Sequence, residues 1–162
     1  MTSRKRTRSA WGRSVVFHRR SAISTPVPFD PPPGDGEEHN AQAGLVVDGN
    51  PATYWTTENY NEMNLAPKPG VGLLFDLGQS SRVTGFELES PYPGYTFQIR
   101  VGDDPNQLAT TTGPAFRITT SDLRQSLAQP LTGRYVLLWI TSVVRNVDGG
   151  NRAAVGEFKV FG

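Results

Sequence analysis

The chain has 162 residues, of which 36% are hydrophobic, with 17 glycines, 13 prolines and no cysteine. The lack of cysteine excludes disulfide bridges, zinc–thiolate sites and cysteine nucleophiles. Glycine and proline are more frequent than average, which favours short strands joined by turns over long helices. No stretch approaches the roughly 18 consecutive apolar residues of a membrane span, so we expect no transmembrane segment in this chain.

The net charge of +1 combines a basic leader with an acidic body. Residues 1–20 hold seven arginines and lysines and no acid, whereas the remainder holds nine basic and fifteen acidic side chains, a net charge of −6. We expect residues 1–28 to be a disordered basic leader and proline-rich linker, followed by one domain over residues 29–162. Binding of the leader to anionic lipid or nucleic acid is an alternative, but we expect no specific nucleic-acid partner. The apolar run at residues 14–17 is too short for an export signal.

The segment at residues 25–36 contains five prolines and ends in Gly34-Asp35-Gly36. Proline fixes φ and removes a backbone donor, so the segment is predicted to be an extended linker that turns into a loop. The acidic loop from Asp30 to Glu38 has two interpretations. It is a solvated turn, or Asp35 and Glu37 share a cation. We favour the solvated turn, because the loop lacks the alternating oxygen positions of an EF-hand.

Short alternating segments with turn signals between them fill the rest of the chain. Residues 71–77 and 95–101 alternate between apolar and other side chains, residues 134–141 are the most apolar strand, and a strand at residues 154–161 closes the chain. Residues 78–81 read as a turn, and Gly85 predicts a bulge in the strand at 82–90. Residues 115–118 and 127–131 are weaker strands, and residues 121–127 are the one helical candidate. The pattern predicts an all-β fold, an antiparallel β-sandwich of the jelly-roll kind.

Trp139 belongs to the face of its predicted strand that points away from the core. If Val136, Leu138 and Ile140 point inward, then Leu137 and Trp139 point outward. Such a pair either lies under a covering segment or forms an interaction patch. We favour cover by the proline-rich segment or a neighbouring loop.

Four motifs follow one another in a characteristic order: Val47-Asp-Gly-Asn-Pro-Ala-Thr-Tyr-Trp-Thr-Thr57, Leu73 to Gly78, Arg134-Tyr-Val136 and Gly156 to Gly162. This order resembles the discoidin, or coagulation-factor type C, superfamily with its galactose-binding-like sandwich. Four segments, residues 29–31, 34–37, 54–60 and 68–73, also resemble the C-terminal extracellular domain of actinobacterial MviN-type lipid II flippases and of some membrane-anchored kinases. The resemblance implies a module at the cell envelope, outside the cell, although no export signal is recognisable in this chain.

An oxygen-rich loop could hold a calcium ion, which takes six to eight oxygen ligands. Asp48 supplies charge, Gly49 permits a sharp turn, and Asn50 and Thr53 return oxygens to the same point. In the resembling modules a glutamate of the last strand completes the shell, which corresponds to Glu157. The alternative is an ordinary Asx-turn in which Asp48 caps its own loop.

The ligand candidates are aromatic and polar residues of predicted loops. Sugars are bound by an aromatic face together with hydrogen bonds to hydroxyls. The resemblance assigns Trp55 to the core, so other aromatic residues are better stacking candidates. The predicted ligand-binding residues are Tyr60, Tyr92, Tyr95, Asn59 and Arg145.

Catalysis finds little support in the sequence. Both histidines precede the predicted sandwich strands, so no Ser-His-Asp relay is available within them. The resemblance and the aromatic loops predict a non-catalytic, monomeric module that recognises a cell-envelope carbohydrate such as peptidoglycan. The alternatives are a protein-interaction module, with an envelope protein as partner, or a purely structural one.

Overall fold

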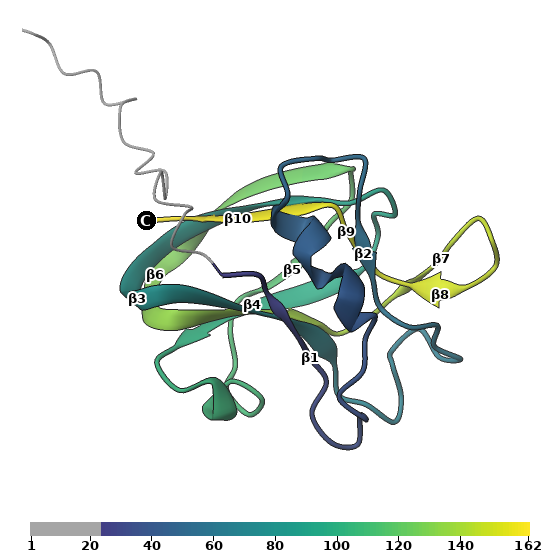
Figure 1. Cartoon of the computed structure of the whole chain (residues 1–162), viewed down its shortest axis with the longest axis horizontal. Helices are drawn as coiled ribbons and strands as arrows, with labels where there is room; N and C mark the ends of the chain where they lie inside the picture. Colours follow the sequence, from purple (N-terminus) through teal and green to yellow (C-terminus); the bar gives the residue numbers. More distant parts are fainter. Residues whose placement is uncertain (1–23) are drawn as a thin grey trace, which may run out of the picture.

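The computed structural model describes residues 24–162. The predictions for the basic leader over residues 1–23 lie outside this part of the chain. The described residues form a mostly β structure, as predicted, built around two very long strands (Figure 1). No helix within residues 24–162 is long and apolar enough to span a bilayer.

One curled antiparallel sheet supplies both layers of the sandwich. Its strands run in the order β1-β3-β6-β4-β5, with β10 also paired to β3. Each half of β3 serves a different layer: Leu74 pairs with Val27 of β1, whereas Glu89 pairs with Glu157 of β10. The strands are β1 (Val27–Phe29), β3 (Val71–Glu89), β4 (Thr96–Gly102), β5 (Ala115–Arg117), β6 (Asp122–Ile140) and β10 (Glu157–Phe161).

The remaining elements are short and lie around the main sheet. Two small antiparallel ladders join β2 (Trp55–Thr56) to β9 (Ala154–Val155), and β7 (Val144–Arg145) to β8 (Asn151–Arg152). The 3₁₀ segments are η2 (Asn40–Val47) and η3 (Pro105–Gln107). The β7–β8 hairpin projects from the end of the sandwich opposite the C-terminus (Figure 1). The loops at this end can therefore expose side chains to solvent.

Two register shifts allow β3 and β6 to curl. The first lies between Asp76 and Ser81, where Gly78 has a φ of 82° and donates to Asp76 Oδ1 at 2.7 Å. The sequence predicts two strands separated by a turn at this point, but the structure contains one bent strand. The second shift lies between Val83 and Gly85, which confirms the predicted bulge. Bulges increase local twist, so a single strand can pass from one layer to the other.

The core lies between the two layers and consists of the side chains predicted from alternation. Val71, Leu73 and Ile99 are fully buried, as are Val136 and Leu138. Aromatic rings from four strands fill its centre: Phe86 lies 5.6 Å from Phe97, 4.9 Å from Phe116 and 6.2 Å from Phe158. The expected period-two pattern thus selects the buried face correctly.

The helical candidate at residues 121–127 is wrong. Residues 122–126 belong to β6 and pair with residues 85–89 of β3. The local sequence is polar and has no strong β preference, but Leu123 is half-buried and Leu127 is buried against the core. Pairing with a neighbouring strand overrides the weak local preference.

Trp139 is covered, as predicted, and only 2% of its surface is exposed. It forms a second small core with Leu137 and Leu108 on the outer face of the sheet. Phe29 of β1 meets the indole edge-on at 6.0 Å, and the Arg100 guanidinium lies 4.9 Å from its ring. Strand β1 begins at Val27, so the proline-rich segment contributes to the fold two residues before the expected boundary. The exposed Leu–Trp patch that would suit a protein partner is absent from the described residues.

Candidate functional site

Hydrogen bonds to its own side chains hold the Asp48 loop together. Asp48 follows η2, and its carboxylate accepts hydrogen bonds from the Asn50 amide at 2.8 Å and from the Thr53 hydroxyl at 2.5 Å. The same hydroxyl lies 3.0 Å from the Asn50 carbonyl oxygen. These bonds form the Asx-turn that the sequence allows, and they lower the pKa of Asp48. The oxygens of the three residues therefore converge on one point.

Glu157 brings a second carboxylate to this loop from the first position of β10. Its side chain contacts Asp48, although the residue is only 5% exposed, and Oε1 has no hydrogen-bond partner. Burial first, and the Asp48 carboxyl second, raise the pKa of Glu157 to about 7. All four predicted metal-site residues thus lie at one place. An unpaired buried oxygen beside a carboxylate, amide and hydroxyl fits the donor set of a hard cation.

Three of the five predicted ligand residues, Asn59, Tyr92 and Arg145, lie around the β7–β8 hairpin, and Tyr60 meets it only through its backbone, because its hydroxyl bonds to Glu38 and Lys68. Arg145 belongs to β7 and is exposed. Asn59 lies close to Gly150: a methyl group on this glycine would be 2.3 Å from the Asn59 Oδ1 atom. Tyr60 contacts the hairpin through its backbone: its amide donates to the Asn151 carbonyl at 3.0 Å, and its carbonyl accepts from the Asn151 side-chain Nδ2 at 3.0 Å.

Tyr92 approaches the same hairpin from the turn before β4. Its ring meets that of Tyr54 edge-on at 5.9 Å. The hydrogen bond with Tyr54 raises the pKa of Tyr92, and the charges of Asp148 and Arg152 lie close enough to affect it. These two residues form an ion pair across the hairpin. An aromatic pair therefore stands beside fixed charged groups at the exposed end of the sandwich.

Tyr95 is not available to a ligand, which corrects its prediction as a binding residue. It is fully buried, and its hydroxyl donates to the Ala154 carbonyl at 2.8 Å. Burial raises its pKa. The period-two alternation that buries Phe97 extends back to Tyr95, so the ring points into the core. Trp55 is likewise fully buried, as predicted, and donates to the Glu38 carbonyl at 2.6 Å.

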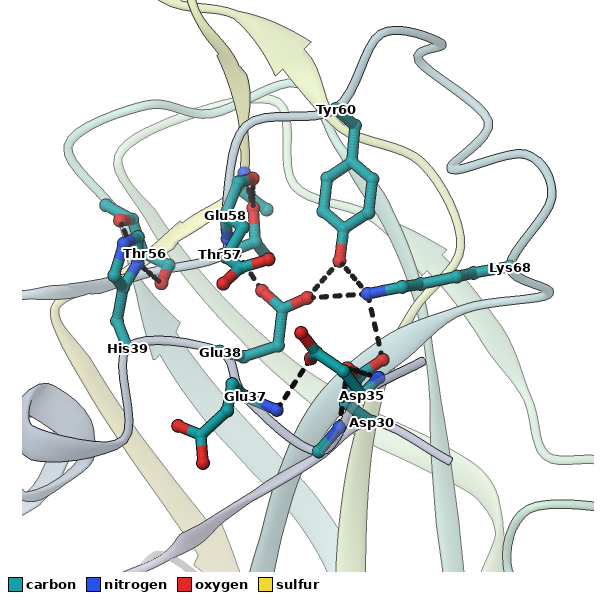
Figure 2. A network of polar contacts seen from close by, with 12 residues as sticks. Asp30, Asp35, Glu37, Glu38, His39, Thr56, Thr57, Glu58, Tyr60 and Lys68 are labelled. Atoms are coloured by element: carbon teal, nitrogen blue, oxygen red, sulfur yellow. Dashed lines mark hydrogen bonds and ion pairs between the residues drawn. The ribbon is translucent and has the colours of Figure 1, made fainter. Parts of the chain in front are cut away.

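A buried ion network joins the proline-rich segment to the loop that carries Tyr60 (Figure 2). The Lys68 ammonium lies 3.0 Å from Asp30 and 3.1 Å from Glu38, and it donates to the Tyr60 hydroxyl at 3.0 Å. Glu38 also accepts from the Tyr60 hydroxyl and, at 2.6 Å, from the Glu58 amide. The side chains of both acids are 0% exposed. The loop from Asp30 to Glu38 is therefore anchored, and the solvated turn favoured from the sequence is wrong for these two residues.

Sequence reasoning did not identify this network. Lys68 is the only lysine or arginine between Arg20 and Arg82, in a stretch rich in acids. That isolation is the one signal in the sequence, and it does not indicate which acids the lysine would meet. Asp35 and Glu37, the pair considered for a second cation, are exposed, and Asp35 accepts from the Glu37 amide at 2.9 Å.

An open groove of about 280 Å³ lies beside the Asp48 loop. It is lined by Pro51, Glu89, Ser90, Pro91, Ser121 and Asp122. The carboxylates of Glu87, Glu89 and Asp122 approach one another within 4.8 Å at this place. All three are at least partly exposed, so water can solvate them.

A comparison with models of protein families identifies the family of this chain. The F5/8 type C domain model matches residues 23–158. The chain belongs to the F5/8 type C domain family. The discoidin resemblance drawn from the four sequence motifs is thereby confirmed.

Solved structures with the same fold include carbohydrate-binding modules. The family 32 CBM from C. perfringens NanJ, in complex with galactose, shares 14% identity at a TM-score of 0.53 over 88% of this chain and 96% of its own. Chitosan-binding module 2 of a Paenibacillus sp. IK-5 chitosanase/glucanase, in complex with chitotriose, shares 19% identity at 0.52 over 74% and 85%. A Ruminococcus gnavus GH29 fucosidase matches at 14% and 0.58 over 87% of this chain, which spans 25% of the enzyme. The TM-scores show that these proteins share the fold of this chain.

Proposed function

We propose that this F5/8 type C domain is a non-catalytic module that binds a carbohydrate through the loops around the β7–β8 hairpin. The observation that carries the proposal is the gathering of Tyr92, Asn59 and Arg145 at the projecting end of the sandwich. An aromatic face flanked by fixed donors and acceptors is the usual composition of a sugar site. The galactose and chitotriose complexes of two proteins with this fold support the same ligand class.

The ligand class is tested on an array of neutral, acidic and amino glycans that includes peptidoglycan fragments. We expect weak binding to at least one group of glycans. Arg145→Ala and Asn59→Ala should each weaken that binding at least tenfold, which corresponds to about 1.4 kcal/mol. The matched controls are Arg82→Ala and Asn106→Ala, which remove exposed side chains of the same types elsewhere. If the array shows no binding, or if the controls weaken it equally, the proposal fails.

We further propose a glycan of the cell envelope as the physiological ligand, with the module placed outside the cell as an accessory domain of a membrane protein. The support is the resemblance of residues 54–60 and 68–73 to the extracellular domains of MviN-type flippases. Cosedimentation of the purified chain with peptidoglycan sacculi tests this assignment. Binding of soluble galactose without binding to sacculi or to other envelope glycans would refute it and retain a carbohydrate ligand.

A calcium ion at the Asp48 loop is a further proposal of ours. Asp48, Asn50, Thr53 and Glu157 would hold it, and the unpaired Oε1 of Glu157 is the observation that supports it. The ion would supply positive charge between two carboxylates that otherwise repel each other. It would thereby connect the loop after η2 to the last strand.

A further inference from the structure

One oxygen of Asp30 is buried without a hydrogen-bond partner and lies beside a lysine. Asp30 Oδ1 is one of six such buried side-chain atoms among residues 24–162. The nitrogen of Lys68 lies 3.0 Å from it, as the partner in an ion pair (Figure 2). The other five atoms belong to the β7–β8 hairpin and the last strand: Asn146 Nδ2, Asn146 Oδ1, Asn151 Oδ1, Arg152 Nε and Glu157 Oε1.

The second oxygen of Asp30 is held by the backbone. Oδ2 accepts hydrogen bonds from the amides of Asp35 at 3.0 Å and Gly36 at 3.1 Å. The carboxyl group also lies directly against Gly34, since a methyl group on this glycine would be 2.3 Å from Asp30 Cγ. Two backbone amides that point at one oxygen stabilise a negative charge that develops on it. The two oxygens of this carboxyl group therefore have different environments: Oδ2 faces two donors, and Oδ1 faces the lysine.

A second buried carboxylate contacts the same lysine nitrogen. Glu38 Oε1 lies 3.1 Å from Lys68 Nζ and also accepts a hydrogen bond from the Tyr60 hydroxyl. The side chains of Asp30 and Glu38 are 0% exposed, and that of Lys68 is 14% exposed. Bulk water is therefore largely excluded from the three groups. An amine, a carboxyl group and a carboxylate that carries protons between them are the groups needed to form an amide bond.

We propose that Lys68 and Asp30 condense to an intramolecular isopeptide bond, with Glu38 as the proton carrier. Glu38 first moves one proton from the Lys68 ammonium to Asp30 Oδ1, which leaves a neutral amine and a neutral carboxylic acid. The nitrogen lone pair then attacks Asp30 Cγ, and the carbonyl electrons move to Oδ2. A second proton passes from the nitrogen to Oδ1 through Glu38, the Cγ–Oδ1 bond breaks and the carbonyl forms again. One water leaves, the amide is neutral, and Glu38 returns to its starting state.

Proximity offsets the unfavourable protonation state of the lysine. Burial lowers the pKa of Lys68, but its hydrogen bonds to Tyr60, Asp30 and Glu38 outweigh burial and raise this pKa. The free amine is therefore a minor form at neutral pH. Groups held in contact react as though their concentration were about 10⁵–10⁸ M, and each chain has to react only once. We therefore expect a slow reaction whose product accumulates after folding.

The amide bond suits this place in the fold better than the ion pair does. Its carbonyl keeps the two backbone donors of Asp35 and Gly36, its N–H can donate to Glu38, and the unpaired Oδ1 has left. The bond closes a loop between residues 30 and 68 and restricts the unfolded chain, as a disulfide does. The chain has no cysteine, so no disulfide can take this role. This inference does not depend on the proposed carbohydrate-binding function.

The mass of the intact chain tests the bond. Wild-type protein that is kept folded at neutral pH and then denatured should be lighter than its sequence predicts by one water molecule. Lys68→Arg and Glu38→Gln should retain the full mass of their sequences, because the first lacks the amine and the second lacks the proton carrier. The matched controls, Lys159→Arg and Glu62→Gln, should lose water as the wild type does. A wild type of full mass after prolonged incubation would overturn the proposal, as would a Lys68→Arg chain that loses water.

Peptide mapping of the wild type locates the lost water. Trypsin does not cleave between Lys68 and Pro69, so it leaves residues 21–82 as one peptide. A glutamate-specific protease then separates residues 21–37 from residues 63–82, unless an amide bond joins them. We expect the two peptides to remain linked. Loss of water within a single peptide, as in a succinimide at Asp35-Gly36, would refute the bond. These measurements on the wild type are decisive even if a variant does not fold.

Discussion

The carboxyl groups of Asp48 and Glu157 meet where the loop after η2 contacts the first residue of β10. Asp48 is satisfied by its own loop through Asn50 and Thr53, whereas Glu157 Oε1 has no partner. A proton shared by the two acids therefore affects the stability of the domain. We expect this stability to depend on pH and, through the proposed ion site, on calcium.

In calcium-free buffer, the free energy of unfolding should decrease as pH rises from about 4.5 to about 7. Burial first, then Asp48, raises the folded-state pKa of Glu157 from 4.5 to about 7, so the folded state binds more protons than the unfolded state in this window. The stabilising proton is fully present below the unfolded-state pKa and is lost as pH rises through the folded-state pKa. Urea unfolding at several pH values with a chelator measures the slope. Glu157→Gln should flatten it, and an unchanged slope in this variant would contradict the assignment.

Calcium should stabilise the wild type at neutral pH. An ion that binds only the folded state adds about 2.7 kcal/mol to the free energy of unfolding at a concentration 100 times its Kd. Asp48→Asn and Glu157→Gln should remove this gain, because each neutralises one of the two carboxylates. Thermal unfolding with calcium or with EGTA measures it. Glu62→Gln, which neutralises an exposed acid elsewhere, is the control, and a loss of the gain in this variant would speak against the site.

Lys68→Met should reduce the free energy of unfolding by about 3–5 kcal/mol, the usual cost of removing one partner of a buried ion pair. The substitution would leave Asp30 and Glu38 buried without their cation. Lys159→Met is the matched control and should change stability by less than about 0.5 kcal/mol, since Lys159 has no ion pair within residues 24–162. Chemical denaturation compares the two variants. Similar effects would show that the network contributes nothing specific.

Trp139→Ala should destabilise the domain by about 3–5 kcal/mol, as expected for a buried aromatic side chain. The indole packs against Phe29 and Leu137 and lies under the Arg100 guanidinium. Trp139→Phe should cost less, because it keeps most of the apolar contact. Urea unfolding measures both changes. A stable Trp139→Ala variant that has lost a protein partner would instead support the interaction patch.

Much of the fold could be predicted because alternation in a strand requires no knowledge of the neighbouring strands. The buried faces of residues 71–77 and 95–101 follow from period two alone, whereas residues 136–140 are buried on both faces. Residues 121–127 could not be assigned in this way, because only their pairing with β3 makes them a strand. The continuity of β3 through Gly78 could not be predicted either. The local sequence indicates a turn, and it does not show that the same strand continues in the other layer.

The same distinction holds for the candidate site: its local contacts could be predicted, and its contacts between distant segments could not. The Asp48 loop is local, so its hydrogen bonds to Asn50 and Thr53 follow from residues close in sequence. The prediction for Tyr95 was wrong because its neighbours Pro93 and Gly94 indicate a turn, whereas Tyr95 directly precedes β4 and its side chain is already buried in the core. The environment of Asn146 could not be predicted at all, because burial and missing partners are properties of the folded hairpin.

By itself the sequence determined the class of fold, the buried stripe of each strong strand and the order of the family motifs, because these depend on residues a few positions apart. Only the tertiary structure decided that Lys68 joins Asp30 to Glu38, that Glu157 meets Asp48, and that unpaired amides lie in the hairpin. Each of these depends on which distant segments approach one another. The physical reason is that charge pairing and desolvation act through space, whereas alternation acts along the chain.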